Sequence, residues 1–205
     1  MFEISNLSIS IEDRFLIKNL SLTLNQNDKL AIIGEEGNGK STLLKGILGL
    51  CEYAKVTGNI NTKGNKIGYL EQSLSENNLK KIGYEFIFGN ANSYNYSKKL
   101  YKYLELLNLD EKLLDQKLKT LSGGEKVKIS MLKLLIEEND ILFLDEPTND
   151  LDIETLKWLE NFINGRKEPI VYISHDETLL SNTANVILHI EQLKKKMECK
   201  HTLLR

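Results

Sequence analysis

The stretch Gly34-Glu35-Glu36-Gly37-Asn38-Gly39-Lys40-Ser41-Thr42 decides what this chain folds into. It matches the pattern GxxxxGK[ST], and it lies between an apolar run at 30–33 and a segment with helical spacing at 40–50. Glycines in such a loop let the backbone wrap around phosphate groups, and the amides of the loop and of the helix N-terminus point at the negative charge. We therefore expect a phosphate-binding loop (P-loop) for a nucleotide, rather than a glycine-rich turn without a ligand.

Individual residues of this loop have separate expected roles. The Lys40 ammonium is expected to reach the β- and γ-phosphates, and the Ser41 hydroxyl is expected to ligate Mg²⁺. The loop residues predicted to bind the nucleotide are Gly34, Glu35, Gly37, Asn38, Gly39, Lys40, Ser41 and Thr42. Because such loops occur in many nucleotide-hydrolysing proteins, further motifs are needed to narrow the class.

Apolar patterning outward from the loop predicts an α/β fold. Alternating residues at 3–11 and 15–24 predict an antiparallel hairpin. Buried strands are expected at 30–33, 141–144 and 170–173, short strands within 60–70, and helices at 40–50, 122–138 and 153–163. Strands that alternate with helices favour a parallel sheet covered on both faces. Helical spacing dominates from Ser75 to Leu118, where we expect a helical insert with Asp110 capping a helix that ends at Leu118.

Composition and charge exclude several classes of protein. The chain has 205 residues, 41% hydrophobic and 27% charged, which excludes a disordered or fibrous chain. With 27 basic and 29 acidic residues the net charge is −2, so we expect no sequence-specific DNA binding. Apolar runs such as 141–144 are far shorter than the roughly 20 residues of a membrane span, and the first residues lack signal-peptide character. We therefore expect a cytoplasmic protein.

A second glycine motif, Leu121-Ser122-Gly123-Gly124-Glu125, precedes a helical segment. Ser122 with Glu125 three residues later forms a capping box, which by itself predicts only a well-capped helix. The two glycines are not needed for capping, and they leave bare backbone at a helix N-terminus, where anions bind. We therefore predict a second phosphate site, which serves another molecule's nucleotide if the first loop holds the chain's own.

Two carboxylates, Asp145 and Glu146, follow the buried strand at 141–144. Carboxylates at the end of a buried strand are costly unless they meet a metal ion or transfer protons. Asp145 is expected to hold the shell of Mg²⁺, usually through water, and Glu146 to orient and polarise the attacking water for phosphoryl transfer. The alternative is an ordinary strand exit into a turn.

Taken in order along the chain, the motifs resemble the nucleotide-binding domain of an ATP-binding cassette (ABC) ATPase. The resemblance rests on the P-loop, Gln72, the segment 121–125, Asp145-Glu146 and His175, and it covers essentially the whole chain. It implies one cassette at 1–205, with an α/β core and an antiparallel β part at 1–72 and 119–205 and a helical subdomain at 73–118. It also implies that two cassettes close head to tail around two ATPs, each nucleotide lying between the P-loop of one and Ser122, Gly123 and Gly124 of the other.

The resemblance carries further roles over to single residues. Gln72 matches the glutamine that senses Mg²⁺ and the attacking water, so it is both a catalytic and a metal-site candidate. His175 matches the histidine that contacts the γ-phosphate. Asp152 matches a residue that crosses the dimer interface, and it can also be the N-cap of the following helix. The family usually stacks adenine on an aromatic residue where this chain has Ile11; Phe15 lies nearby as a substitute or as a core residue.

Three details resemble the ABC-F branch of the family: the run 147–155, Ser174-His175-Asp176 with the leucines after it, and the segment 187–191. ABC-F proteins carry two cassettes in one chain and act on ribosomes, as translation factors or in protection from antibiotics. The resemblance implies a cassette of a longer protein, paired with a second cassette in the same chain or with a second copy. The alternatives are the ATP-binding subunit of a membrane transporter and a non-hydrolysing nucleotide-binding module.

Overall fold

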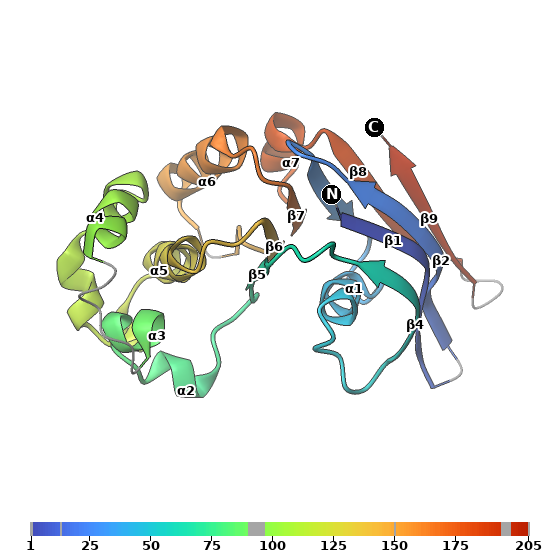
Figure 1. The fold of residues 1–205 in the computed structure, drawn as a ribbon, viewed down its shortest axis with the longest axis horizontal. Coiled ribbons are helices and arrows are strands. Elements are labelled where there is room, and N and C mark those ends of the chain that lie inside the picture. The colour runs from blue at the N-terminus through green and yellow to red at the C-terminus, as the bar shows by residue number, and fades with distance from the viewer. Residues whose placement is uncertain (1, 13, 90–96, 150, 194–197, 205) are drawn as a thin grey trace.

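The computed structural model describes residues 2–12, 14–89, 97–149, 151–193 and 198–204, and they form two sheets and a helical region (Figure 1). The strand order is β2-β1-β4 in the smaller sheet and β5-β6-β7-β3-β8-β9 in the larger one. The predicted α/β class, with a mainly parallel sheet, an antiparallel part and a helical insert, is confirmed. In the part of the chain that is described, no helix is both long and apolar enough to cross a membrane.

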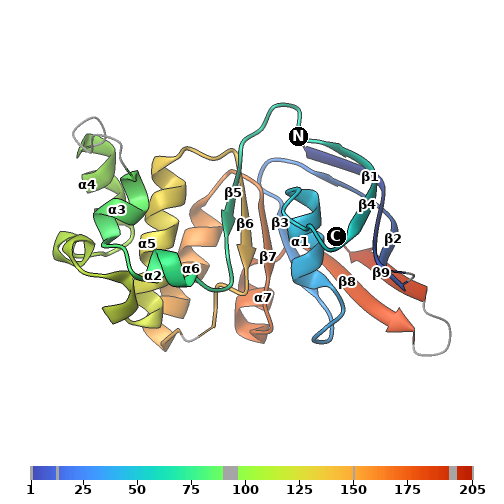
Figure 2. The same ribbon diagram turned by 90° about the horizontal axis from the view of Figure 1, so that it is seen from below.

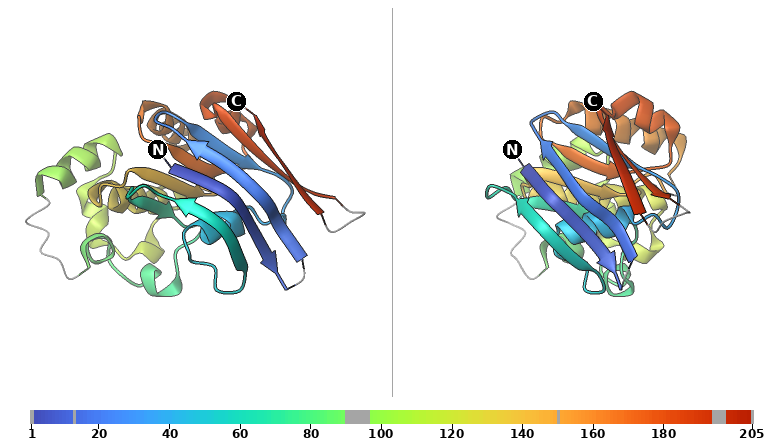
Figure 3. Two further views of the ribbon diagram at one scale, coloured as in Figure 1. Left: turned by 45° about the vertical axis from the view of Figure 1, so that its right-hand side comes forward. Right: turned by 90° about the vertical axis from the view of Figure 1, so that its right-hand side faces the viewer.

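The smaller sheet is antiparallel. The predicted hairpin is present as β1 (Phe2–Ile11) and β2 (Arg14–Leu24), and β4 (Lys55–Asn61) pairs with the other edge of β1. Helix α1 (Lys40–Ile47) packs between this sheet and the larger one (Figure 2), and the apolar side chains of all three form one core. The approach is close, because a Cβ atom at Gly46 would lie 2.7 Å from Ile9 Cδ1. Strand β2 also lies beside β9 (Figure 3), so the two sheets meet along one side.

The larger sheet is parallel except at one edge. Its members are β5 (Ile67–Leu70), β6 (Ile141–Asp145), β7 (Ile170–Ile173), β3 (Lys29–Ile33) and β8 (Val186–Leu193), with β9 (Glu198–Leu204) antiparallel to β8. Residues of β6 and β7 are buried throughout, as their continuous apolar sequences predict. Because these strands are parallel, the loops that follow β3, β5, β6 and β7 all leave from the same edge of the sheet.

Helices form the part of the molecule on the far side of the larger sheet from the antiparallel sheet (Figure 1). The two longest are α5 (Gly123–Ile136) and α6 (Ile153–Gly165), and the shorter α7 (Glu177–Thr183) comes later in the chain. A second apolar core lies between these helices, the sheet and the insert. The insert contains α2 (Glu76–Leu79), α3 (Gly83–Phe88), α4 (Ser97–Leu106) and the 3-10 turns η2 (Glu111–Asp115) and η3 (Leu118–Thr120).

One local expectation in the insert is wrong. Asp110 does cap the next segment by accepting a hydrogen bond from the Lys112 amide at 2.9 Å, but that segment is a 3-10 turn and not a helix that ends at Leu118. The backbone becomes extended again at Gln116. There the Gln116 carbonyl accepts a hydrogen bond from the Gly83 amide, so a tertiary contact replaces the next helical turn.

Candidate nucleotide-binding site

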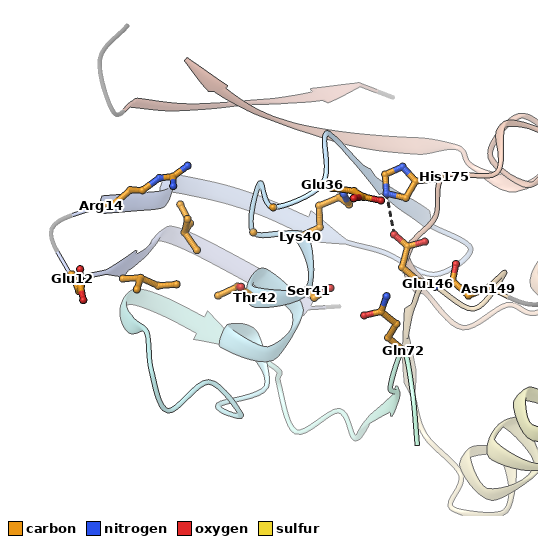
Figure 4. A pocket seen from close by; sticks show the side chains of 14 residues that line it. Glu12, Arg14, Glu36, Lys40, Ser41, Thr42, Gln72, Glu146, Asn149 and His175 are labelled. Atoms are coloured by element: carbon orange, nitrogen blue, oxygen red, sulfur yellow. Dashed lines mark ion pairs between the residues drawn. The ribbon is translucent and has the colours of Figure 1, made fainter. Parts of the chain in front are cut away.

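A pocket with a volume of about 750 Å³ lies at the carboxyl edge of the larger sheet and extends to the tip of the β1–β2 hairpin (Figure 4). One end is polar and is formed by the loops after β3, β5, β6 and β7. The other end is formed by the hairpin. The polar end contains Glu36, Gly37, Gly39, Lys40, Ser41, Thr42, Gln72, Glu146, Asn149 and His175, and the hairpin end contains Ile11, Glu12, Arg14 and Leu16.

The glycine-rich loop has the conformation that a phosphate cradle requires. Gly39, the N-cap of α1, has φ 88°, a left-handed conformation that other residues rarely adopt. A Cβ atom at Gly34 would collide with the carbonyl oxygen of Ile190 on β8. The buried Asn38 amide donates a hydrogen bond to the same carbonyl at 3.2 Å, so the loop is held against the backbone of β8. The loop is therefore pre-formed, with its amides at the N-terminus of α1.

Lys40 is folded back over the loop. Its Nζ donates hydrogen bonds to the carbonyl oxygens of Gly34 at 2.9 Å and Glu35 at 3.1 Å, and the side chain is buried. Glu35 contributes this carbonyl but does not line the pocket, whereas Thr42 does. The ammonium is thus held at the centre of the cradle, where it adds a positive charge to the partial charges of the amides.

Ser41 and Asp145 come together although they are far apart in sequence. The Ser41 hydroxyl donates to Asp145 Oδ1 at 2.8 Å, and the Tyr69 hydroxyl donates to Asp145 Oδ2 at 3.0 Å. Among the described residues no group of three or more His, Cys, Asp or Glu side chains is arranged to hold a metal ion. A hydroxyl and a buried carboxylate beside a phosphate cradle nevertheless fit Mg²⁺, which prefers oxygen ligands and keeps few protein ligands when phosphates complete its shell.

Glu146 and His175 form a pair at the polar end of the pocket. Glu146 Oε1 lies 3.2 Å from His175 Nε2, with the glutamate buried and the imidazole half exposed. Burial raises the pKa of the Glu146 carboxyl above its ordinary value, and electrostatic interactions with His175 and Lys40 partly oppose this. Its backbone has φ 49°, an uncommon conformation for a residue other than glycine, and its amide donates to the Ile173 carbonyl at 3.1 Å.

The hairpin end differs from the expectation for Phe15. Ile11 lines the pocket, but Phe15 does not: its ring is 41% exposed, with the Lys18 ammonium 5.6 Å from the ring centre. Successive residues of a strand point to opposite faces, so Phe15 cannot share the face of Arg14 and Leu16. Alternation separates the two sets of residues, but only the fold shows that the face of Arg14 and Leu16 is the one that lines the pocket.

Two further lining residues, Glu36 and Asn149, lie within motifs that the sequence analysis used but were not predicted as site residues. Glu36 is an exposed residue of the phosphate loop, and Asn149 lies just after the Asp145-Glu146 segment. Neither position is fixed by the chemistry that defines its motif, so only the fold places these side chains in the pocket.

The second glycine motif does not reach this pocket within one chain. Ser122 caps α5 by accepting from the Glu125 amide at 3.3 Å, while the Ser122 amide donates to the Glu125 carboxylate at 2.8 Å, which confirms the capping box. Gly123 lines a separate cavity of about 250 Å³ together with Gln72 and Asn149.

Gly124 and Asp152 lie outside the pocket as well. Gly124 packs against α6, since a Cβ atom there would lie 2.9 Å from Thr155 Oγ1. Asp152 is the N-cap of α6: its carboxylate accepts from the Thr155 amide at 2.7 Å, and this hydrogen bond lowers the pKa of Asp152. The residues expected to serve a neighbour's nucleotide are therefore separate from the chain's own phosphate cradle.

A phosphate loop after the third strand, carboxylates at the end of a neighbouring parallel strand and a helical insert between them define an ATP-binding cassette. The family model described as ABC transporter matches residues 17–149, and the chain belongs to this family. The solved dimeric structure of an ATP-binding cassette in a post-hydrolysis state, bound to ADP and Pi, has a TM-score of 0.71 at 21% identity, with 92% of this chain and 94% of that chain covered. This likeness confirms the fold.

Relatives by sequence agree with a cassette of the ABC-F type. The ATP-binding protein Uup of Buchnera aphidicola is 38% identical over 90% of this chain, and ABC transporter F family member 5 of Arabidopsis thaliana is 34% identical over 92%. The ribosome protection protein VmlR of Bacillus subtilis is 33% identical over 89%. The chain spans only 31%, 27% and 33% of these three proteins, respectively.

Proposed function

We propose that this cassette binds Mg-ATP in the pocket and hydrolyses it in a head-to-tail pair of cassettes. The observation that carries the proposal is the pair formed by the buried Glu146 carboxylate and the half-exposed His175 imidazole, 3.2 Å apart, in the same pocket as Lys40. A bare nucleotide-binding module needs the phosphate cradle but not a buried carboxylate with a raised pKa beside it. The pair therefore favours hydrolysis over binding alone.

Each residue in and beside the pocket has a separate role in the proposed hydrolysis of Mg-ATP. The loop amides and Lys40 bind the phosphates, and Ser41, Asp145 and Gln72 would hold Mg²⁺, which neutralises phosphate charge. Glu146 orients the attacking water and accepts its proton, and its raised pKa makes it a better base than an exposed carboxylate. His175, half exposed beside Glu146, contacts the γ-phosphate and stabilises the charge that develops there.

The location of Ser122, Gly123 and Gly124 supports the pairing. These residues lie at the N-terminus of a 14-residue helix, α5, whose partial positive charge favours an anion. In a head-to-tail pair this helix end would face the γ-phosphate bound to the other cassette, and Asp152 would lie near the interface. The partner is a second cassette, in the same longer protein or in a second copy of this chain.

For the work that ATP energises, we propose action on the ribosome, in the cytoplasm, as an ABC-F protein. Support comes from the relatives, which include an ABC transporter F family member and a ribosome protection protein. The test uses the natural gene, tagged in its source cell and carrying Glu146→Gln to retain ATP, with lysis in Mg-ATP. We expect the product to sediment with ribosomes; its recovery in the membrane pellet would instead make the cassette the ATP-binding subunit of a transporter.

A further inference from the structure

We propose that Tyr69 is a positioning residue for the Mg²⁺ site, because its hydroxyl fixes the orientation of the Asp145 carboxylate. This inference rests on the proposed function, in which Asp145 holds the shell of the metal ion. Tyr69 lies on β5, which is not part of the phosphate cradle, and it does not line the nucleotide pocket. It would act on the metal site only through Asp145.

The sheet brings the two side chains together. Strands β5 and β6 are parallel neighbours, with Tyr69 paired to Phe143 and Leu70 to Leu144, so that Asp145 ends β6 one residue further along (Figure 2). The Tyr69 hydroxyl donates to Asp145 Oδ2 at 3.0 Å, and the other oxygen, Oδ1, accepts from Ser41 at 2.8 Å. Each carboxylate oxygen therefore has its own donor, from opposite sides of β6.

Nucleotide binding is expected to affect the Ser41 and Tyr69 hydroxyls differently. Ser41 is itself a candidate metal ligand, so its hydroxyl must reorient toward the ion. Tyr69 is then the side-chain donor that stays with Asp145, whose residue is only 1% exposed. A buried carboxylate that loses a donor is left poorly compensated and free to rotate about its last bond.

Tyr69 is suited to this part because a phenol, whose ordinary pKa is about 10, is protonated at physiological pH and can donate a hydrogen bond. Partners of this kind, which hold a metal-site carboxylate from outside the coordination shell, typically change metal affinity by about 10–100-fold when removed.

The test separates the metal ion from the nucleotide. ATP affinity is measured by calorimetry in EDTA and at increasing Mg²⁺ concentration, for the wild-type chain and for Tyr69→Phe. We expect unchanged affinity for ATP in EDTA, and a midpoint of the Mg²⁺ dependence shifted upward by about 10-fold or more. The matched control is Tyr172→Phe on the neighbouring strand β7, which removes a buried hydroxyl that is hydrogen-bonded to Thr183 of α7 and not to Asp145.

Several outcomes would overturn the inference. One is a Tyr69→Phe variant with the wild-type Mg²⁺ midpoint, and another is an equal shift in Tyr172→Phe, which would indicate a general loss of packing. Asp145→Asn provides a second check: in that background Tyr69→Phe should cause no further shift. If the wild-type chain shows no Mg²⁺-dependent ATP binding at all, the proposed function fails; if only the Tyr69 effect is missing, this inference alone fails.

Discussion

The two ends of the nucleotide pocket are built in different ways. At the phosphate end, Lys40, Asp145 and Glu146 are each buried, and each has a hydrogen-bond or ion-pair partner nearby. At the hairpin end, Glu12 and Arg14 are exposed, and among the described residues neither takes part in an ion pair. The difference indicates that the phosphate end is rigid and specific before any ligand arrives, whereas the hairpin end is left to adapt to the base.

The largest expected effect is at the centre of the phosphate end. Lys40→Ala should abolish detectable Mg-ATP binding in calorimetry. Hydrogen bonds to charged groups contribute about 1.5–3 kcal/mol each, so losing two phosphate contacts weakens binding by about 10²–10⁴-fold. Lys45→Ala, in the last turn of the same helix and outside the pocket, is the matched control. If Lys40→Ala bound Mg-ATP with wild-type affinity, the glycine-rich loop would not be the phosphate-binding part of the site.

A second large effect is expected on turnover alone. Glu146→Gln should retain ATP binding, favour an ATP-bound dimer and lower the hydrolysis rate by about 10²–10⁴-fold, because the water loses its base. Glu177→Gln, an exposed carboxylate in the first turn of α7 and outside the pocket, should hydrolyse ATP like the wild type. Normal single-turnover hydrolysis by the Glu146 variant would assign the base to another group.

At the hairpin end the expected effects are small. Arg14→Ala should weaken ATP and GTP binding by about 2–5-fold, because an exposed guanidinium over a base contributes about 0.5–1 kcal/mol. Phe15→Ala should leave both affinities unchanged, since its ring lies outside the pocket. A larger loss in Phe15→Ala than in Arg14→Ala would show that the base lies on the other face of the hairpin.

The smallest effect concerns stability. The pKa of Glu146 is raised above its ordinary value of 4.5, so folding favours the protonated form. Between 4.5 and the raised value the folded state binds more protons than the unfolded one, so this group's contribution to stability falls as the pH rises through that window.

Glu146→Gln should therefore melt higher than the wild type at neutral pH, with the difference vanishing below pH 4.5. Calorimetric scans at neutral pH and below pH 4.5 measure this difference, and each 1 kcal/mol moves the melting temperature of a domain of this size by about 2–4 °C. An equal difference at all pH values would mean that burial of the charge is not its cause.

The same contrast explains how much could be predicted from the sequence. Three motifs could be recognised because each directly follows an apolar strand and consists of residues suited to phosphate or metal binding: the phosphate loop, Asp145-Glu146 and His175. The structure places them around one pocket or directly behind it. The hairpin and the parallel strands followed from apolar patterns, which reflect burial.

What could not be predicted depends on tertiary contacts. The η2 turn ends where the Gln116 carbonyl meets Gly83, and the Tyr69–Asp145 hydrogen bond depends on the order of strands in the sheet. The choice of Arg14 over Phe15 depends on which face of β2 points to the nucleotide, and a one-residue difference in register decides it.

The central claim is that the chain carries two half-sites, the P-loop and the N-terminus of α5, which complete each other only in a head-to-tail pair. The most direct measurement mixes two variants, Lys40→Ala and Gly123→Asp, and follows ATP hydrolysis at high protein concentration. An acidic residue at the start of α5 is compatible with the helix but repels phosphate. Each variant alone should be inactive, and the mixture should regain activity, because one of the two sites in a mixed pair is intact. Where the wild-type chain alone hydrolyses ATP under these conditions, a mixture as inactive as its components would contradict the account.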